Sequence, residues 1–162
     1  MRFDVQLNIT GMFLKDPKKA MGIFAEEFGK LFEEATSFCM RAVVRGTPVF
    51  RGALSEATFR EVRGTGLALH GLVANPLAYA GFIETGRPAH TPDFNQLAEW
   101  VRTKMGLEGA PLYAVTRAIA QKISKSGIRP RSMFQKGFET AKMEIPKMIE
   151  KTESRIIQRW NS

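Results

Sequence analysis

The chain has few of the residues on which disulfide-linked proteins and metal sites depend. Its 162 residues include one cysteine, Cys39, and two histidines, His70 and His90. A single cysteine cannot form an internal disulfide, so we expect a buried thiol in a reducing compartment. Neither histidine has metal-binding or catalytic spacing, and a structural role is the favoured interpretation of both. His90, in a loop with two prolines, is the better candidate for a site.

Motifs of enzyme active sites are also missing. The sequence contains no HExxH, paired CxxC, phosphate loop or GxSxG. Glu84 has no second carboxylate or histidine at a defined spacing, so we interpret it as a local cap or ion-pair partner rather than a general base. The sequence predicts a protein that is not an enzyme and needs no cofactor and no metal, with a small hydrolase as a weaker alternative.

Long apolar segments are scarce. Residues 1–6 lack the apolar region of a secretory signal. The longest uncharged run, residues 64–83, is interrupted by glycines and by Asn75 and Pro76, so we expect a soluble protein with no membrane partner. The length, with 44% hydrophobic and 25% charged residues, fits one folded domain spanning residues 1–162.

Positive charge is concentrated in the carboxyl-terminal half. The formal net charge is +8, and residues 87–162 carry 14 Lys or Arg against 7 Asp or Glu. Residues 109–138 include six basic side chains and no acidic one. The six are Arg117, Lys122, Lys125, Arg129, Arg131 and Lys136. A positive surface in this region faces water, a polyanion or an acidic partner.

Several segments show helical periodicity. Asp16-Pro17 is a typical helix start, and apolar residues spaced three and four apart from Met21 to Val43 predict about eight turns of helix. We expect this stripe to pack across a sheet, with a partner-binding or coiled-coil surface as the alternative. Its glutamates are expected on a solvated face: Glu26, Glu27, Glu33 and Glu34. Shorter helices are expected over residues 93–105 and 111–125, and a final helix from Ser132, with a kink at Pro146.

Three segments have strand patterns. Residues 3–10 alternate between apolar and polar side chains, and residues 54–63 and 67–74 flank Gly64-Thr65-Gly66 as a hairpin would, the second strand being the more apolar and expected to be the more buried. The predicted fold class is α+β. It consists of a small antiparallel sheet, made of an N-terminal strand plus a central hairpin, packed by a long N-terminal helix. Residues 1–86 form the core, residues 87–131 a loop-helix-helix segment and residues 132–162 a long C-terminal helix.

Four groups of residues, in order over about residues 40–140, carry a family resemblance. They are Thr47-Pro48-Val49 with Gly52 and Leu54, the hairpin, Tyr79-Ala80 with Phe82-Ile83-Glu84 and Gly86, and Ile128-Arg129-Pro130 with Met133-Phe134. Together they resemble the tail-completion or neck proteins that join head to tail in long-tailed, lambdoid-type bacteriophages. The chain departs from the family pattern at Phe50, usually acidic, at Ala53, usually arginine, and in the long segment between Pro88 and Gly127.

The resemblance implies a structural virion protein of the neck and tail, made in the cytoplasm of the bacterial host. Such a subunit forms a homo-oligomeric ring, hexameric or dodecameric, that completes or terminates the tail. Its implied partners are its own copies, the tail tube, and head-completion or connector proteins. Candidate subunit or partner contacts are Arg87, Pro88, His90, Ile128, Arg129, Pro130, Arg131, Met133 and Phe134.

A row of basic residues in the last helix suggests an additional contact. Lys147, Lys151, Arg155 and Arg159 stand four residues apart, which predicts one basic ridge. The ridge is either a solvated face or a non-specific contact with phage DNA. The alternative function is therefore a non-specific nucleic-acid-binding protein that uses its basic carboxyl-terminal half.

Overall fold

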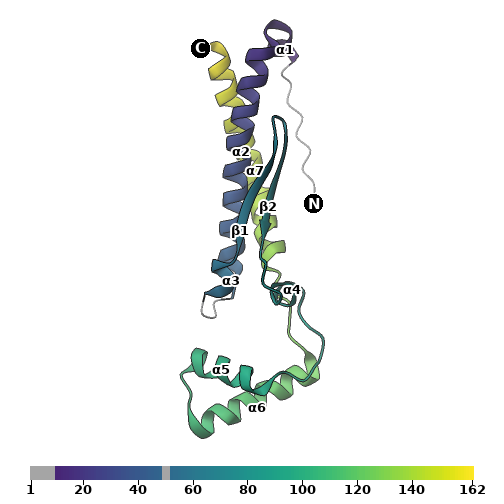
Figure 1. Ribbon diagram of the computed structural model, residues 1–162, viewed down its shortest axis with the longest axis vertical. Helices are drawn as coiled ribbons and strands as arrows, with labels where there is room; N and C mark the ends of the chain where they lie inside the picture. Colours follow the sequence, from purple (N-terminus) through teal and green to yellow (C-terminus); the bar gives the residue numbers. More distant parts are fainter. Residues whose placement is uncertain (1–9, 49–51) are drawn as a thin grey trace. The chain divides into compact units, whose positions relative to one another are not determined.

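The computed structural model describes residues 10–48 and 52–162, which form helices and one two-stranded antiparallel sheet (Figure 1). The elements, in order, are α1 (Thr10–Lys15), α2 (Pro17–Gly46), α3 (Ala53–Glu56), β1 (Phe59–Thr65), β2 (Ala68–Ala74), α4 (Ala80–Thr85), α5 (Phe94–Met105), α6 (Gly109–Ser126) and α7 (Met133–Asn161). The α+β class, with its long N-terminal and C-terminal helices, is confirmed.

The chain divides into two compact units. Of the described residues, those within Met1–Cys39, Arg60–Val73 and Thr140–Ser162 belong to the first unit, and those within Met40–Phe59 and Ala74–Glu139 to the second. The sequence-based segments 1–86, 87–131 and 132–162 do not coincide with this division, because α2 and α7 each contribute residues to both units. A single domain over residues 1–162 stays a prediction.

Helix α2 begins where the sequence predicts. The Asp16 carboxylate accepts a hydrogen bond from the Lys19 backbone amide at 3.0 Å, and Pro17 takes the first helical position, where no amide donor is needed. The helix continues for 30 residues to Gly46, just before Thr47-Pro48. Local signals therefore fix both of its ends.

The core of the first unit lies between α2 and α7. Ala20, Ile23 and Phe24 from α2 are buried with Ile156 from α7. The sequence predicted that the α2 stripe packs across the sheet, and the hairpin does contact α2, since a side chain at Gly71 would clash with Thr36. The part of the stripe formed by Ala20, Ile23 and Phe24 is nevertheless covered by helix α7.

The hairpin differs from its prediction in two respects. Residues 53–56 are helical, so β1 starts at Phe59 rather than near Leu54. This helical turn follows Gly52, which has a left-handed conformation, and the Asn75 side-chain amide donates a hydrogen bond to the Leu54 carbonyl oxygen at 2.7 Å. Neither strand contains a buried residue and each has three partly buried ones, so the prediction that the second strand is the more buried is wrong. Both strands are edges of a two-stranded ribbon, so neither lies inside a sheet. The predicted strand over residues 3–10 falls largely outside the described residues, and Thr10 itself begins α1.

In the second unit, α5 and α6 pack on each other through Ala98, Val101 and Leu112. The predicted helix 93–105 is confirmed: the Asp93 carboxylate accepts from the Gln96 amide at 2.9 Å, and Gly106 ends the helix in the left-handed conformation. Helix α6 starts two residues before Pro111, which a proline in the first turn permits because those amides have no intrahelical partner.

Helix α7 contains Pro146 and is helical on both sides of it, so the kink predicted there stays a prediction. In the second unit, Gly137 brings α7 close to α2. A Cβ added at Gly137 would lie 2.7 Å from the backbone nitrogen of Val43 and 2.9 Å from its Cα. The contact therefore requires a residue without a side chain.

This close approach predicts opposite effects for two helical glycines. Gly137→Ala should lower the free energy of unfolding by about 1–3 kcal/mol, because the Val43 backbone cannot yield as a flexible side chain would. The matched control, Gly22→Ala in α2, meets nothing within 4 Å and should raise stability by about 0.5–1 kcal/mol through helix propensity. Urea denaturation measures both. Equal effects of the two substitutions would contradict the proposed steric contact.

Candidate functional site

The segments that carry the family resemblance meet within the second unit. The Thr47 hydroxyl donates to the Met133 sulfur at 3.4 Å. The Asn75 amide, at the end of the hairpin, donates to the Leu54 carbonyl oxygen at 2.7 Å and to the Thr58 hydroxyl at 2.9 Å. Val49 and Phe50 lie outside the described residues. Residues up to 86 positions apart in the chain are therefore neighbours in space.

Two segments that contain candidate subunit contacts, residues 87–88 and 128–131, pair with each other, and we call them the arms. Arg87 and Ile128 form an antiparallel bridge in which each backbone amide donates to the other residue's carbonyl oxygen, at 2.9 and 2.8 Å. Gly86 and Gly127, beside the bridge, both have positive φ, and a Cβ at Gly86 would lie 2.6 Å from the Ile128 oxygen. The bridge therefore depends on glycine at these two positions.

Glu84 joins the α4 segment to the start of α7. Its carboxylate accepts hydrogen bonds from the backbone amides of Phe134 at 2.8 Å and Gln135 at 3.0 Å. These amides lie in the first turn of α7, where they have no partner within the helix. Glu84 does cap a helix, but the prediction of a local role is wrong, because the helix that it caps begins about 50 residues later.

The paired arms expose aromatic, aliphatic and cationic groups together. The Arg87 guanidinium lies 5.0 Å from the centre of the Phe82 ring, which is 48% exposed. Ile128 is 38% exposed, and as the residue directly opposite Arg87 it projects from the same face of the bridge. We call Phe82, Arg87 and Ile128 the arm surface. Exposed aromatic and arginine side chains are the groups enriched in the centres of protein interfaces.

The other predicted contact residues divide between exposed and interior positions. Pro88, Arg129, Pro130 and Arg131 are exposed. Met133 is fully buried and Phe134 half-buried, so they pack inside the second unit. His90 is half-buried, with Nδ1 2.9 Å from the Pro88 carbonyl oxygen.

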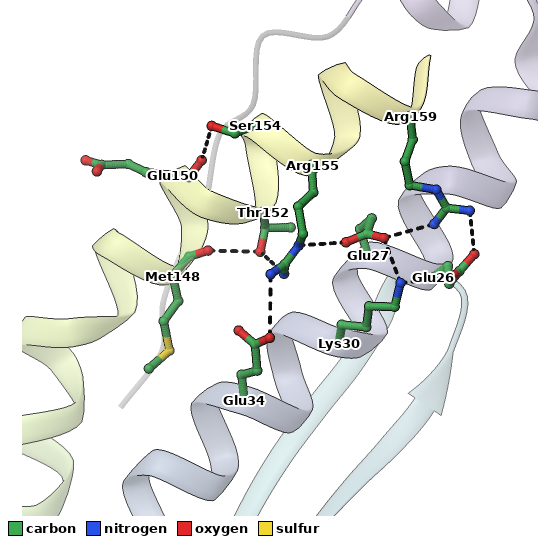
Figure 2. Close-up of polar contacts among 10 residues, drawn as sticks. All are labelled: Glu26, Glu27, Lys30, Glu34, Met148, Glu150, Thr152, Ser154, Arg155 and Arg159. Atoms are coloured by element: carbon green, nitrogen blue, oxygen red, sulfur yellow. Dashed lines mark hydrogen bonds and ion pairs between the residues drawn. The ribbon is translucent and has the colours of Figure 1, made fainter. Parts of the chain in front are cut away.

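A second polar cluster lies in the first unit, between α2 and α7 (Figure 2). The Glu27 side chain, 1% exposed, accepts hydrogen bonds from Arg155 Nε at 2.8 Å, Arg159 Nη1 at 2.9 Å and Lys30 Nζ at 2.9 Å. The prediction of a solvated face is wrong for Glu27, because the α7 arginines reach across to it. Burial alone raises the pKa of Glu27, but hydrogen bonds from Lys30 and the arginines outweigh burial and lower it.

Neighbouring carboxylates extend the cluster. Glu26 accepts from Arg159 Nη2 at 2.7 Å and from Lys30 Nζ at 2.9 Å, and these hydrogen bonds lower the pKa of Glu26 to about 2. Glu34 lies 3.5 Å from Arg155 Nη1. The α2 glutamates therefore neutralise the α7 arginines.

The predicted basic ridge of α7 is consequently divided. Arg155 and Arg159 point toward α2, as Figure 2 shows. Lys147 forms an ion pair with Glu144 on its own helix at 2.9 Å, and Lys151 is exposed. The sequence missed this arrangement because i, i+4 spacing shows which residues share a face and not what the face meets.

Comparison with known proteins gives no relative: no family model, no curated protein and no solved structure matches this chain. Within residues 10–48 and 52–162, no group of three or more His, Cys, Asp or Glu side chains is placed to hold a metal ion. In the same ranges, no helix combines the length and the apolar character that a membrane span requires. Cys39 is half-buried, and burial raises the pKa of its thiol.

The cap on α7 can be tested by removing one carboxylate. Glu84→Ala should lower the free energy of unfolding by about 1 kcal/mol, because two first-turn amides lose their acceptor. Hydrogen exchange should quicken at the Phe134 and Gln135 amides. Glu150→Ala, an exposed carboxylate later in the same helix, should change stability by less than about 0.5 kcal/mol. Unchanged exchange at both amides would contradict the cap.

The pKa values of Glu26 and Glu27 predict how the stability of the fold depends on pH in acid. Glu26 and Glu27 have lower pKa values in the folded chain than the ordinary 4.5, so their stabilising effect is complete above pH 4.5 and is lost as the pH falls toward about 2. Glu27→Ala should lower stability at neutral pH by about 2 kcal/mol, since it leaves two partly exposed arginines without their shared partner. It should also flatten the acid dependence. Urea denaturation across this pH range measures both effects.

Glu33→Ala is the matched control for this cluster. Glu33 is also an α2 glutamate with an arginine partner, Arg60, but its side chain is 55% exposed. Its removal should cost less than about 1 kcal/mol. Equal losses for the two variants would show that burial of Glu27 adds nothing.

Proposed function

We propose that this chain is a structural subunit of a tailed bacteriophage, which completes the tail and joins it to the head as part of a ring of identical copies. Its partners in this proposal are its own copies, the tail tube and the head-completion or connector proteins, and its place is the neck of the virion. The resemblance of residues 47–54, 79–86 and 128–134 to tail-completion or neck proteins is the origin of this proposal.

One observation carries the proposal beyond that resemblance. The resembling segments are far apart in the sequence, yet hydrogen bonds join them in one unit: Thr47 to Met133, and Glu84 to Phe134. These hydrogen bonds join the resembling segments into one structural element. Their convergence supports a shared structural purpose, which is to hold the paired arms.

The arm surface suits contact with another copy of the chain. A ring requires two different patches on each subunit, one meeting the other on the next copy. Phe82 and Ile128 supply apolar area, and Arg87 supplies a planar group that stacks and donates several hydrogen bonds. Glu84, Gly86 and Gly127 hold this surface on a rigid backbone, which reduces the conformational entropy lost on association.

Assembly of the purified chain tests the proposal. Mass photometry and negative-stain imaging should show closed rings of uniform mass. Phe82→Ser combined with Ile128→Ser should weaken assembly at least about 10-fold in the concentration required, because two exposed apolar contacts are lost. The melting temperature of the dissociated subunit should fall only slightly, since Phe82 is 48% and Ile128 38% exposed in the single chain.

Met143→Ser is the control for exposed apolar area, because Met143 is 69% exposed and lies in the first unit. It should leave the ring intact. A chain that stays monomeric at every soluble concentration would contradict the ring, and a monomer that binds nucleic acid tightly would favour the alternative function.

A further inference from the structure

Helix α6 presents basic side chains without acidic neighbours on the same helix. Arg117, Lys122 and Lys125 are all exposed, and the helix, which the structure describes in full, contains no Asp or Glu. None of the three takes part in an ion pair recorded among residues 10–48 and 52–162. We call Arg117, Lys122 and Lys125 the α6 basic face.

The packing of α6 fixes where these charges point. Leu112 and Thr116 are buried on the side that meets α5. At about 100° per residue, Arg117 and Lys125 lie near the centre of the opposite, exposed arc, and Lys122 lies at its edge. Arg117 and Lys125 are separated along the helix axis by about 12 Å. The charges therefore form an extended row instead of a single point.

Charge is distributed unequally between the two units. The second unit contains 12 Lys or Arg against 6 Asp or Glu, whereas the first contains 12 against 10. Second-unit residues thus carry +6 of the net +8. In the first unit, moreover, carboxylates of α2 bind Arg155 and Arg159. The second unit therefore holds most of the excess positive charge.

The exposed side of α6 suits a phosphate backbone better than a protein. The other exposed residues between its charges are Ala118, Gln121 and Ser124, none of which has a large apolar side chain. Tyr113, 57% exposed and stacked on Phe94, is the large apolar residue exposed on this helix. A stable protein interface needs a buried apolar centre, which one tyrosine does not provide. A DNA backbone needs cations and hydrogen-bond donors spaced along it, and it carries one charge per about 1.7 Å of duplex axis.

We propose that the α6 basic face binds the phosphate backbone of duplex DNA without sequence preference. Arg117 and Lys125 contact phosphates along one stretch of backbone, Lys122 contacts its flank, and the Tyr113 hydroxyl donates to a phosphate or sugar oxygen. This inference does not rest on the proposed ring, because each chain carries its own α6.

The test uses a charge-matched pair of variants of the full chain. The first combines Arg117→Gln, Lys122→Gln and Lys125→Gln. The control combines Lys15→Gln, Lys18→Gln and Lys142→Gln, three exposed lysines of the first unit, so both variants lose three positive charges. Fluorescence anisotropy measures binding to labelled duplexes of two unrelated sequences at about 50–200 mM salt. Thermal melting confirms that both variants remain folded.

We expect the α6 variant to bind both duplexes at least about 10-fold more weakly at the lowest salt, with the slope of log affinity against log salt reduced by about 2.7 for three lost phosphate contacts. The first-unit control should stay within about 3-fold of the unmodified chain, since it changes only the net charge. Equal losses in the two variants, a large difference between the two duplexes, or no binding at about 50 mM salt would each overturn the proposal. So would equally tight binding of polyglutamate, which would indicate an acidic protein partner.

Discussion

Contact between α2 and α7 is the constraint on which the described fold depends. In the first unit, Ile156 of α7 is buried with Phe24 and Ile23 of α2; in the second, Gly137 of α7 lies against Val43 of α2. The sheet cannot replace this contact, because it has two strands and neither contains a buried residue. A lone hairpin is marginally stable in water, so it is stabilised by the helix it lies on, and not the reverse.

A buried carboxylate makes this helix contact specific as well as stable. Removing Glu27 from water is costly, and the cost is offset only where cations reach both of its oxygens. Arg155 and Arg159 do so from α7, and Lys30 does so from the same helix. Sliding α7 along α2 by one turn would carry at least one of the two arginines away from Glu27, whereas Lys30 would stay because it lies on the same helix. Apolar contacts alone would tolerate such a shift far better, so the cluster fixes the register in the first unit.

The sequence was informative where structure is determined locally. The starts of α2 and α5 follow from Asp16 and Asp93, and the end of α5 follows from Gly106, because each cap involves residues within one turn. It was uninformative where distant residues meet. The bridge between Arg87 and Ile128 and the capping of α7 by Glu84 each join segments 40 or more positions apart, and no local pattern specifies such a partner. The arm residues were identified through resemblance, but their pairing was not.

The basic ridge of α7 shows how a correct local pattern can give an incomplete surface. Residues four apart on a helix are displaced by about 40° at each step, since four residues turn the chain by about 400°. From Lys147 to Arg159 the row therefore rotates by about 120°, from solvent toward the side where Thr152 and Ile156 are buried. The two lysines at its start remain outside, whereas the two arginines at its end reach the glutamates of α2. On α6, Arg117 and Lys125 lie on the exposed side opposite Leu112, so their charge stays available. The packing of each helix, more than its number of basic residues, decides which surface can attract an anion.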